Sequence, residues 1–324
     1  MSHPVLNVVV TRKRDEALDI ASIELVSEGG EAAQPLPPFT AGSHVDVHLP
    51  GGLVRQYSLC NDPTETHRYV IAVLRDESGR GGSKAVHDLV HEGDRLQISV
   101  PRNQFALAHE APHHLLLAGG IGVTPILCMA ERLAATGESF DMHYCTRSRA
   151  RTAFVERISQ AGFRESVQIH HDDSAGGSTF DLDRVLENVP EGTHLYVCGP
   201  KGFMDAVLNA ARAKAWAEDR LHYEFFAAPV EQQTTGDSFQ VRIASSGATI
   251  DVPSGCTVVQ ALAANGIDII TSCEQGVCGT CLTKVLSGEP EHRDFYLTDE
   301  ERAANDQFLP CCSRARSPLL VLDL

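Results

Sequence analysis

The sequence has no long apolar run. Nowhere do about 18 consecutive apolar residues occur, the length that a membrane-spanning helix requires. Residues 1–14 also lack an apolar core of signal-peptide length, and the chain contains neither an internal repeat nor a low-complexity segment. We therefore expect a soluble, cytoplasmic protein without a membrane partner.

Basic residues are scarce as well. The chain has 27 Lys and Arg against 43 Asp and Glu, a formal net charge of −16. Because nucleic-acid phosphates are bound through clustered Lys and Arg, this balance argues against a nucleic-acid partner. The negative charge could steer a partner protein that has a basic docking patch, or it could simply keep the protein soluble.

Cysteine is plentiful, with ten residues, but a disulfide framework is not indicated. Six cysteines show no framework spacing, and most of them lie in apolar runs, where cysteine acts as a small hydrophobic residue: Cys60, Cys128, Cys145, Cys198, Cys256 and Cys312. A reducing compartment is expected.

The other four cysteines give the strongest chemical signal in the sequence. Cys273, Cys278 and Cys281 crowd one loop, and Cys311 follows after twenty-nine intervening residues. Cys-x4-Cys-x2-Cys…Cys is the ligand pattern of a plant-type [2Fe–2S] cluster, in which four thiolates hold two irons. Structural zinc, the alternative, usually takes two ligands from each of two short turns. By count alone, Cys312 could replace Cys311 as the fourth ligand.

Two glycines in this loop support a cluster. Gly276 and Gly279 would let the backbone approach an inorganic core at points where a Cβ atom would collide with it.

Three patterns of strands and helices follow one another along the chain. Residues 1–106 contain short alternating apolar runs between turns, which indicates a β-barrel or sandwich. Strand-like and helix-like runs alternate in 107–227, which predicts a parallel sheet with helices on both faces. A polar segment, 228–237, is typical of a linker. A hairpin, a helix and the cysteine loop follow in 238–324.

Two glycine turns in the second region each stand between an apolar strand and a helix. In the run Gly119-Gly120-Ile121-Gly122-Val123-Thr124-Pro125 backbone N–H groups can approach a phosphate, Thr124 can cap the helix and Pro125 fits its first position. This run departs from the Gly-x-Gly-x-x-Gly fingerprint, so alone it could be only a tight turn. The second turn is Cys198-Gly199-Pro200. Because ligands of open parallel sheets bind at the carboxyl ends of the strands, we expect the two turns to meet.

Two further motifs lie in the first region. The run Arg55-Gln56-Tyr57-Ser58-Leu59 could be an ordinary strand edge. The glycine loop Gly79-Arg80-Gly81-Gly82-Ser83-Lys84 leads into a helix-like segment at 85–90. Such a helix start is a ready phosphate site, with Ser83 and Arg55 as additional donors.

Taken in order, Arg-x-Tyr-Ser, Gly-Arg-Gly-Gly-Ser, Gly-Gly-Ile-Gly-x-Thr-Pro, Cys-Gly-Pro and the cysteine pattern resemble the phthalate dioxygenase reductase family over essentially the whole chain. The resemblance implies a multidomain fold. An FMN-binding β-barrel would occupy 1–106, an α/β parallel-sheet NAD domain of ferredoxin-reductase type 107–227, and an α+β, β-grasp plant-type ferredoxin domain 238–324. The family's Cys-x-Ser-Arg-Ala ending, matched by residues 311–315, favours Cys311 as the fourth ligand.

The resemblance also implies which residues contact the cofactors. The flavin residues would be Arg55, Tyr57 and Ser58 lining FMN, Gly81, Gly82 and Ser83 holding its phosphate, Ile71, Ala72, Val73 and Leu74 along the ring edge, Thr124 near the ring, and Phe226 beside it. Phe225 is the register alternative to Phe226. The nucleotide residues would be Gly119, Gly120, Gly122, Cys198, Gly199 and Pro200 of the two turns, with Thr146, Arg147 and Asp172 after candidate strands.

The choice between NADH and NADPH depends on basic residues near these loops. There is no dense basic cluster to hold a 2′-phosphate, so NADH is favoured, although Arg149 and Arg151 beside Arg147 keep NADPH open. The adjacent pairs His113-His114 and His170-His171 point to opposite faces of a strand, so we expect packing or surface residues rather than metal ligands.

The function that the resemblance implies is an NADH-dependent reductase. Electrons would pass from NADH to FMN, to the [2Fe–2S] cluster and to a Rieske-type terminal oxygenase or demethylase, without a catalytic acid, base or nucleophile. The flavin is needed because nicotinamide gives two electrons together whereas the cluster accepts one. Glu274, Gln275 and Val277 would lie near the docking surface for the partner.

Three alternatives remain open from the sequence. The reductase could serve another acceptor, such as a haem monooxygenase. The chain could be an electron carrier whose flavin and nucleotide domains are inactive. It could also be a zinc-stabilised binding protein.

Overall fold

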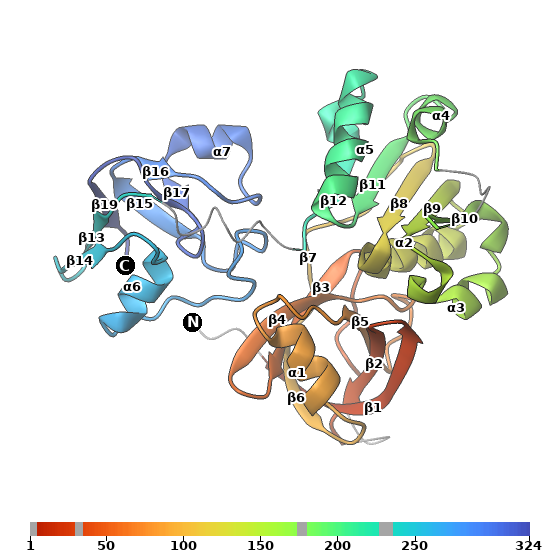
Figure 1. Cartoon of the computed structure of the whole chain (residues 1–324), viewed down its shortest axis with the longest axis horizontal. Coiled ribbons are helices and arrows are strands. Elements are labelled where there is room, and N and C mark those ends of the chain that lie inside the picture. Colours follow the sequence, from red (N-terminus) through yellow and green to blue (C-terminus); the bar gives the residue numbers. More distant parts are fainter. Residues whose placement is uncertain (1–4, 30–34, 174–179, 227–235) are drawn as a thin grey trace. The chain divides into compact units, whose positions relative to one another are not determined.

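The structure is a computed structural model of the chain (Figure 1). It describes residues 5–29, 35–173, 180–226 and 236–324. The chain forms two compact units, residues 1–224 and 225–324. Most of the predicted linker, 228–237, lies outside the described residues. Among the residues that are described, no helix has both the length and the apolar character needed to cross a membrane.

The first unit begins with an antiparallel, barrel-like sheet. Its strands are β1 (Val5–Ala17), β2 (Ile20–Ser27), β3 (Ser43–Leu49), β4 (Leu53–Ser58), β5 (Tyr69–Leu74), β6 (Arg95–Ser99) and β7 (Arg102–Asn103). They follow the order β4-β3-β6-β1-β2-β5, with β7 paired to β3. A bridge between Leu59 and Ile71 joins the two edge strands at their ends and so closes the sheet.

The barrel core follows from alternation along its strands. Val45 and Val47 of β3 point to one face and are almost fully buried. Helix α1 (Gly82–Leu89) packs against β3, β4 and β5. The start of this helix therefore lies beside the strands that carry the Arg-x-Tyr-Ser motif.

The second part of the first unit is a five-stranded parallel sheet. Its strands are β8 (His114–Gly119), β9 (Phe140–Thr146), β10 (Val167–His171), β11 (His194–Cys198) and β12 (Leu221–Glu224), in the order β10-β9-β8-β11-β12. Strand β8 is buried along its whole length, as expected for a parallel strand covered on both faces. From β8 the chain adds β9 and β10 on one side and then crosses over to add β11 and β12 on the other side. The carboxyl ends of β8 and β11 therefore form a topological switch point.

Helices connect the strands of this sheet (Figure 1). They are α2 (Val123–Thr136), α3 (Val155–Gln160), α4 (Leu182–Glu187) and α5 (Lys201–Ala213). Helix α2 packs on β8, β9 and β11, and α4 packs beside α5. Helices α2 and α5 begin at the two glycine turns, so the fold brings both helix starts to the switch point.

The second unit, 225–324, is a small mixed sheet with two short helices. Its elements are β13 (Phe239–Ile243), β14 (Thr249–Val252), α6 (Val258–Ala264), β15 (Thr283–Ser287), β16 (Pro290–Glu291), α7 (Asp299–Ala304), β17 (Gln307–Phe308), β18 (Arg314–Ala315) and β19 (Leu319–Leu322). The main sheet runs β14-β13-β19-β15-β17, with β13 and β19 parallel. Thr257 and Gln260 form a capping box at the start of α6, which packs on β14.

The predicted fold class is confirmed. The chain contains the antiparallel barrel-like sheet, the parallel sheet with helices and the ferredoxin-type sheet.

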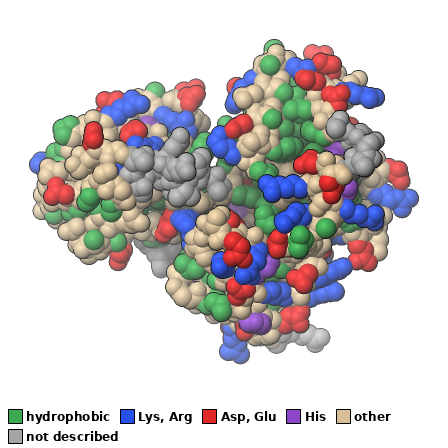
Figure 2. Space-filling view, viewed as in Figure 1, with side chains coloured by type: hydrophobic (Ala, Val, Ile, Leu, Met, Phe, Trp, Pro, Cys, Tyr) green, Lys and Arg blue, Asp and Glu red, His purple; other side chains and the backbone are tan. Residues whose placement is uncertain are grey.

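Acidic and basic side chains are interspersed over the face shown in Figure 2. The boundary predicted near residue 106 stays a prediction, because residues 1–224 form one compact unit.

Candidate functional site

The cysteine loop lies between α6 and β15, and Cys311 lies between β17 and β18. All four side chains are buried. A hydrogen bond between the Cys273 and Cys278 thiols raises the pKa of Cys273 and lowers the pKa of Cys278 to about 6. A hydrogen bond with the Cys311 thiol raises the pKa of Cys281. The thiols of Cys273 and Cys278 are thus bonded to each other, as are those of Cys281 and Cys311, and Cys311 also bonds the Cys312 thiol.

This pairing tests which metal group the cysteines fit. Zinc needs one tetrahedral set of ligands, whereas the thiol bonds join Cys273 to Cys278 and Cys281 to Cys311. A [2Fe–2S] cluster instead needs two ligands on each of two irons. The Gln275 N–H group lies 3.3 Å from the Cys273 Sγ atom, a contact of the kind that tunes cluster potentials. The residues present fit the two-iron cluster.

The two adjacent cysteines 311 and 312 have different surroundings. The Cys311 thiol lies beside that of Cys281. The fully buried Cys312 thiol also bonds that of Cys311, and its Sγ atom lies 3.6 Å from the Leu309 carbonyl oxygen and 3.8 Å from the Ser313 Oγ atom. Cys311 therefore has the position that completes the second pair.

The two loop glycines have protein neighbours. Gly276 and Gly279 adopt φ angles of 73° and 68°. A Cβ atom at Gly276 would lie 2.4 Å from the Cys312 Sγ atom, and one at Gly279 would lie 2.3 Å from the Tyr296 ring. The sequence interpretation named only an inorganic core, so it missed Cys312 and Tyr296 as the groups that require glycine here.

The predicted phosphate residues meet at the start of α1. Gly81 has a φ of 80° and caps this helix without a side-chain hydrogen bond, which leaves the first backbone N–H groups for a ligand. A Cβ atom at Gly82 would lie 2.4 Å from the Arg55 Cγ atom. The Arg55 Nη2 atom donates to the Arg80 carbonyl oxygen at 2.9 Å. An oxygen-rich anion such as a flavin phosphate fits this cradle.

Ser83 differs from the other residues of this group. Its hydroxyl accepts a hydrogen bond from the Asp76 N–H group at 3.0 Å. In this structure the Ser83 side chain thus holds the loop before α1, and its contact with a phosphate stays a prediction.

The predicted ring-side residues come from the neighbouring strands β4 and β5. Ser58 is 6% exposed, and burial raises the pKa of the half-buried Tyr57. On β5, Ile71, Ala72 and Val73 are buried, and Leu74 is half-buried. The Leu59–Ile71 bridge brings these strands together.

The two glycine turns of the parallel sheet meet, as the sequence predicts. A Cβ atom at Gly122 would lie 2.2 Å from the Cys198 carbonyl oxygen, and one at Gly199 would lie 2.9 Å from the Gly119 Cα atom. Gly120 has a φ of 53°. Pro200 caps α5. The contact requires glycine because backbone packs directly on backbone.

The predicted helix cap at Thr124 is wrong. Helix α2 begins at Val123, with Gly122 as its N-cap, and Pro125 is the third helical residue rather than the first. The Thr124 hydroxyl donates to the Ile121 carbonyl oxygen at 3.1 Å. Because Thr124 is already inside the helix, its side chain bonds back to the preceding turn instead of capping the helix.

The other predicted nucleotide residues gather at the ends of β9 and β10. The Asp172 N–H group donates to the Thr146 carbonyl oxygen at 3.0 Å. The Thr146 Oγ1 atom lies 2.8 Å from the Thr152 Oγ1 atom and 2.9 Å from the His171 Nδ1 atom. Arg147 and Asp172 are exposed. These loops flank the switch point of the sheet.

The histidine pairs of the sequence are packing residues. His114 is fully buried, and its Nε2 atom lies 3.3 Å from the Glu138 carboxylate. His170 stacks on His143, with ring centroids 5.3 Å apart. The predicted packing of His114 and His170 is observed, and the prediction that the pairs ligate no metal stays a prediction.

Phe226 belongs to the second unit, residues 225–324, as does Phe225, and the Phe226 side chain is 37% exposed. The Phe225 ring contacts the Phe295 ring, with centroids 4.9 Å apart. A role for Phe226 beside the flavin stays a prediction.

Sequence reasoning missed two residues beside the Arg-x-Tyr-Ser motif. The Ser58 hydroxyl donates to the Glu224 Oε2 atom at 3.3 Å, and the His44 Nδ1 atom lies 3.9 Å from the Glu224 Oε1 atom. The signal for Glu224 was a carboxylate at the end of a strand, next to Phe225. His44 had no sequence signal, because its partner is far away along the chain.

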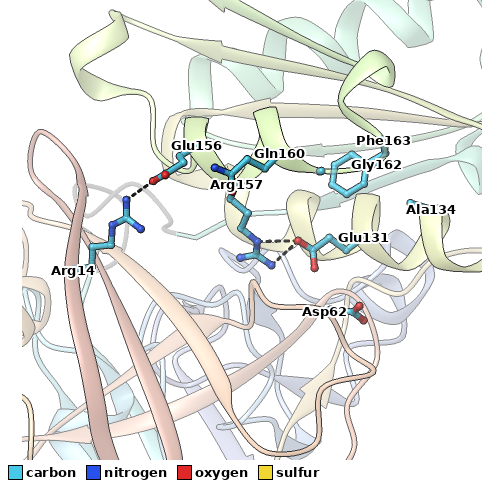
Figure 3. Close-up of a pocket in the computed structure, with 10 residues that line it drawn as sticks. Arg14, Asp62, Glu131, Ala134, Glu156, Arg157, Gln160, Gly162 and Phe163 are labelled. Carbon is cyan, nitrogen blue, oxygen red and sulfur yellow. Dashed lines mark hydrogen bonds and ion pairs between the residues drawn. The ribbon is translucent and has the colours of Figure 1, made fainter.

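A cavity of about 540 Å³ between β1, α2 and α3 is lined by none of the predicted site residues (Figure 3). There Arg14 pairs with Glu156 at 2.8 Å, and Arg157 pairs with Glu131 at 2.6 Å. These ion pairs hold the elements of the first unit together, so we assign this cavity no cofactor.

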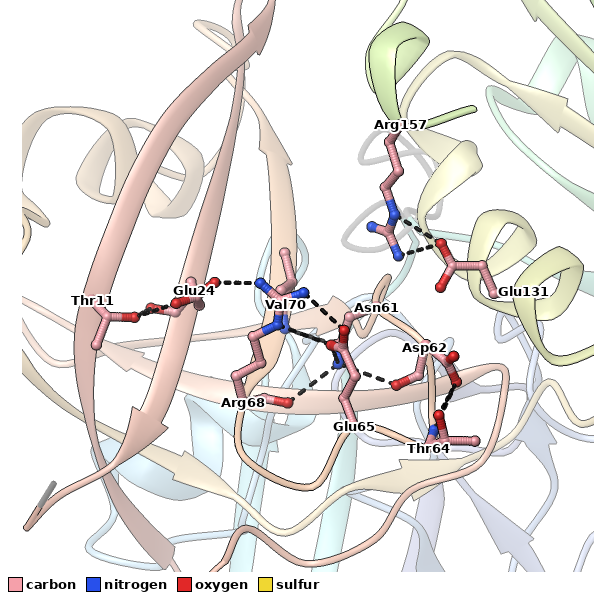
Figure 4. A network of polar contacts seen from close by, with 10 residues as sticks. All are labelled: Thr11, Glu24, Asn61, Asp62, Thr64, Glu65, Arg68, Val70, Glu131 and Arg157. Carbon is pink, nitrogen blue, oxygen red and sulfur yellow. Dashed lines mark hydrogen bonds and ion pairs between the residues drawn. The ribbon is translucent and has the colours of Figure 1, made fainter. Parts of the chain in front are cut away.

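A second group of ion pairs lies on the barrel (Figure 4). The Arg68 guanidinium pairs with Glu24 at 2.6 Å and with Glu65 at 2.9 Å. The Asn61 side chain donates to Glu65 and accepts from the Val70 N–H group. This network fixes the loop between β4 and β5, and hence the two strands of the flavin motif.

Comparisons with known proteins agree with this geometry. Residues 241–316 match the family model of the 2Fe-2S iron-sulfur cluster binding domain. Residues 96–221 match that of the dimethylamine monooxygenase subunit DmmA-like N-terminal domain. The vanillate O-demethylase oxidoreductase of Pseudomonas putida is 53% identical over 322 residues, which cover 99% of this chain and 100% of the relative.

Two solved structures match over almost the whole chain. Phthalate dioxygenase reductase, described as a modular structure for electron transfer from pyridine nucleotides to [2Fe–2S], is 41% identical with a TM-score of 0.78, over 99% of this chain and 98% of that one. An intact type IV self-sufficient cytochrome P450 monooxygenase is 38% identical with a TM-score of 0.84, over 99% of this chain and 41% of that one.

Fold and sites define an oxidoreductase, the reductase component of an oxygenase system. The chain belongs to the phthalate dioxygenase reductase family. The predicted route of electrons, from NADH through FMN to a [2Fe–2S] cluster, is the route of this family. A terminal oxygenase is the matching partner.

Proposed function

We propose that the chain is the NADH-dependent reductase of a Rieske-type oxygenase that removes a methyl group from, or hydroxylates, a small aromatic acid. The observation that carries this proposal is the end-to-end match to a vanillate O-demethylase oxidoreductase at 53% identity. We further propose that residues 1–106 bind FMN, 107–227 bind NADH and 238–324 bind the cluster, with 228–237 as the linker.

The FMN site is proposed at β4, β5 and α1. Gly81, Gly82 and Arg55 would hold the phosphate at the start of α1, since the uncapped N–H groups and the guanidinium both favour an anion. Tyr57 and Ser58 would line the ring, with 71–74 along its edge. When bound, the flavin accepts a hydride and gives up its electrons singly.

The NADH site is proposed at the switch point of the parallel sheet. The backbone of the two glycine turns would hold the pyrophosphate between β8 and β11. Thr146, Arg147 and Asp172 would contact the rest of the dinucleotide. The Asp172 carboxylate is exposed, and it would repel a 2′-phosphate, which supports NADH over NADPH.

The cluster ligands are proposed to be Cys273, Cys278, Cys281 and Cys311. Their arrangement as two thiol pairs supports this set. Glu274 is exposed on the same loop, and Gln275 and Val277 are half-buried. We propose that these three residues lie in the surface that docks the oxygenase.

The test begins with the purified protein under anaerobic conditions. Addition of NADH should bleach a bound FMN first and a two-iron absorbance second. The reduced protein should then support turnover of vanillate by the oxygenase component of a vanillate O-demethylase. Failure of NADH to reduce either group would refute the reductase function, and reduction without any turnover would refute the partner class.

A second acceptor is favoured by one observation. The chain matches 41% of a self-sufficient P450 monooxygenase over its own full length. A haem monooxygenase is therefore the alternative partner. Faster electron transfer to a soluble P450 than to the demethylase oxygenase would favour it.

A further inference from the structure

The two sulfur atoms of the first thiol pair each have a polar group beside them. The Gln275 N–H group lies 3.3 Å from the Cys273 Sγ atom. The Thr280 Oγ1 atom lies 3.2 Å from the Cys278 Sγ atom. As an iron ligand Cys278 carries no proton, so the Thr280 hydroxyl would then donate to it. Because hydrogen bonds to the sulfur ligands help to set the reduction potential of an iron–sulfur cluster, both contacts can act on that potential.

The second pair, Cys281 and Cys311, has a different kind of neighbour. The Cys311 backbone N–H group donates to the Cys281 thiol. The Cys312 thiol bonds the Cys311 thiol. A backbone donor is present whatever side chain a position carries, but the thiol at 312 is a property of this sequence. Position 312 is therefore a place at which the sequence itself can act on a cluster ligand.

Packing holds the Cys312 side chain in place. It is fully buried, and a Cβ atom at Gly276 would lie 2.4 Å from its Sγ atom, so the sulfur packs directly on the backbone of the cysteine loop. Its other polar neighbours are the Leu309 carbonyl oxygen at 3.6 Å and the Ser313 Oγ atom at 3.8 Å. The Ser313 hydroxyl in turn donates to the Asp294 Oδ1 atom at 3.4 Å. In such a buried place a hydrogen bond is stronger than in water.

The single S–H hydrogen of Cys312 has three acceptors within reach. The Leu309 carbonyl and the Ser313 hydroxyl are neutral, whereas Cys311 is a thiolate when it binds iron. Hydrogen bonds to an ionised acceptor are roughly twice as strong as those between neutral groups. Cys312 itself keeps its proton, because a second thiolate in these buried surroundings would be costly. The Cys311 sulfur atom is therefore the strongest of the three acceptors.

We propose that Cys312 donates its S–H hydrogen to the Cys311 sulfur atom in the loaded protein and thereby raises the reduction potential of the cluster. Reduction adds negative charge, part of it on the sulfur ligands, so a donor at Cys311 stabilises the reduced form more than the oxidised form. A higher potential favours the transfer of single electrons out of the flavin. This inference rests on the proposed function, since it requires Cys311 to be the fourth ligand.

The first test is an anaerobic titration with dithionite, which needs neither NADH nor an oxygenase. The electron paramagnetic resonance signal of the reduced cluster gives the reduction potential. In Cys312→Ala the one-electron equilibrium should shift against cluster reduction by roughly three- to tenfold, which is about 30 to 60 mV at about 59 mV per tenfold change. Cys312→Ser keeps a donor on the same carbon atom and should recover most of this shift.

Cys256→Ala is the matched control. Cys256 belongs to the same unit, but its thiol donates to the Thr257 carbonyl oxygen at 3.5 Å rather than to a cluster ligand. The potential of Cys256→Ala should therefore equal that of the wild type. Iron and acid-labile sulfide content and circular dichroism show whether each variant is loaded and folded.

The second test detects the hydrogen itself. The S–H stretching frequency falls as the hydrogen bond strengthens, so infrared difference spectra between oxidised and dithionite-reduced wild-type protein should contain an S–H band that moves in D2O. That band should be absent from Cys312→Ser and Cys312→Ala and present in Cys256→Ala. A merely structural role of Cys312 would not produce it.

The outcomes separate this inference from the function on which it rests. A loaded Cys312→Ala protein with the wild-type potential would overturn the thiol donor alone. A wild-type difference spectrum without an S–H band would do the same, even if Cys312→Ala did not fold. Wild-type protein that holds no iron and sulfide would overturn the proposed cluster site as well. A cluster with the predicted Cys312 effects in a protein that NADH does not reduce would overturn only the reductase function.

Discussion

Twenty-nine residues stand between Cys281 and Cys311 along the chain, yet their thiols are hydrogen-bonded to each other. The neighbouring Cys312 thiol bonds the Cys311 thiol and also lies by Leu309 and Ser313. Of these two adjacent thiols, that of Cys311 is the one in contact with Cys281.

The first prediction concerns these adjacent cysteines. Cys311→Ser should lose the cluster, because a serine hydroxyl replaces the thiolate of the second pair. Cys312→Ser should keep it, with at most a small loss of stability from the buried polar substitution. Iron and acid-labile sulfide analysis, together with visible absorbance, measures the cluster content of each variant. Loss of the cluster in Cys312→Ser but not in Cys311→Ser would reverse the assignment.

The second prediction concerns Gly279 on the cluster loop. Gly279→Ala should destabilise the second unit by about 2 kcal/mol or more, because the new Cβ atom meets the Tyr296 ring and φ is positive. Gly266→Ala is the control: it also has a positive φ, of 76°, but no neighbour within 4 Å, and should cost about 1 kcal/mol. Urea unfolding gives both values.

A double variant isolates the clash. Gly279→Ala should lose more unfolding free energy than Gly266→Ala. Adding Tyr296→Ala to Gly279→Ala should restore this additional part of the loss. An unchanged unfolding midpoint in Gly279→Ala would show that Tyr296 does not restrict the loop.

The third prediction concerns the start of α1. Gly82→Ala should displace Arg55, whose Cγ atom lies where the new methyl group would be, and weaken FMN binding by roughly tenfold, about 1.4 kcal/mol. Gly202→Ala, at the start of α5 with no neighbour within 4 Å, should leave FMN affinity unchanged. Flavin fluorescence on titration of the deflavinated protein measures the affinity. Equal FMN affinities in both variants would show that the start of α1 is not part of the flavin site.

The fourth prediction concerns pH and the stacked imidazoles of β9 and β10. Burial lowers the pKa of His143 to about 4, assisted by the neighbouring His170, whose own pKa burial also lowers. The unfolded chain then binds more protons than the folded chain between pH 6.5 and 4. The stability of the first unit should therefore be complete above pH 6.5 and decline as the pH falls through this window, by at most about 1.4 kcal/mol per pH unit for each histidine.

Thermal unfolding from pH 7.5 to 4.5 measures this slope. His143→Gln should flatten it, while His91→Gln, on an exposed side chain, should not. A slope that is the same in all three proteins would show that another group controls acid sensitivity.

Local patterns were enough to predict much of the fold. The apolar run 69–74 forms a strand over its whole length, because six apolar residues stand between turn signals. The runs 167–171 and 258–264 likewise form a strand and a helix. The two-residue strands β16, β17 and β18 after the cysteine loop have no such local pattern, because their formation depends on distant partners rather than on local periodicity.

The residues of the candidate site also fall into those that local sequence predicts and those that depend on long-range packing. The cysteine ligands and both glycine turns follow from spacing and backbone requirements, which a sequence shows directly. Glu224 and His44 do not, because a strand of the parallel sheet must first pack against the barrel before a carboxyl at 224 can reach a ring at 44. The sequence also does not show that Cys312 and Tyr296 leave no room for a side chain at Gly276 and Gly279, because these contacts depend on the folded structure.

The contact between the two glycine turns also limits how this chain can change over generations. The atom that a side chain at Gly122 would meet is the carbonyl oxygen of Cys198, which every amino acid carries. A second substitution at position 198 therefore cannot make room, as it could if a side chain were in the way. We expect a glycine at 122 in any descendant that keeps this pair of strand ends together, whatever happens to the surrounding residues.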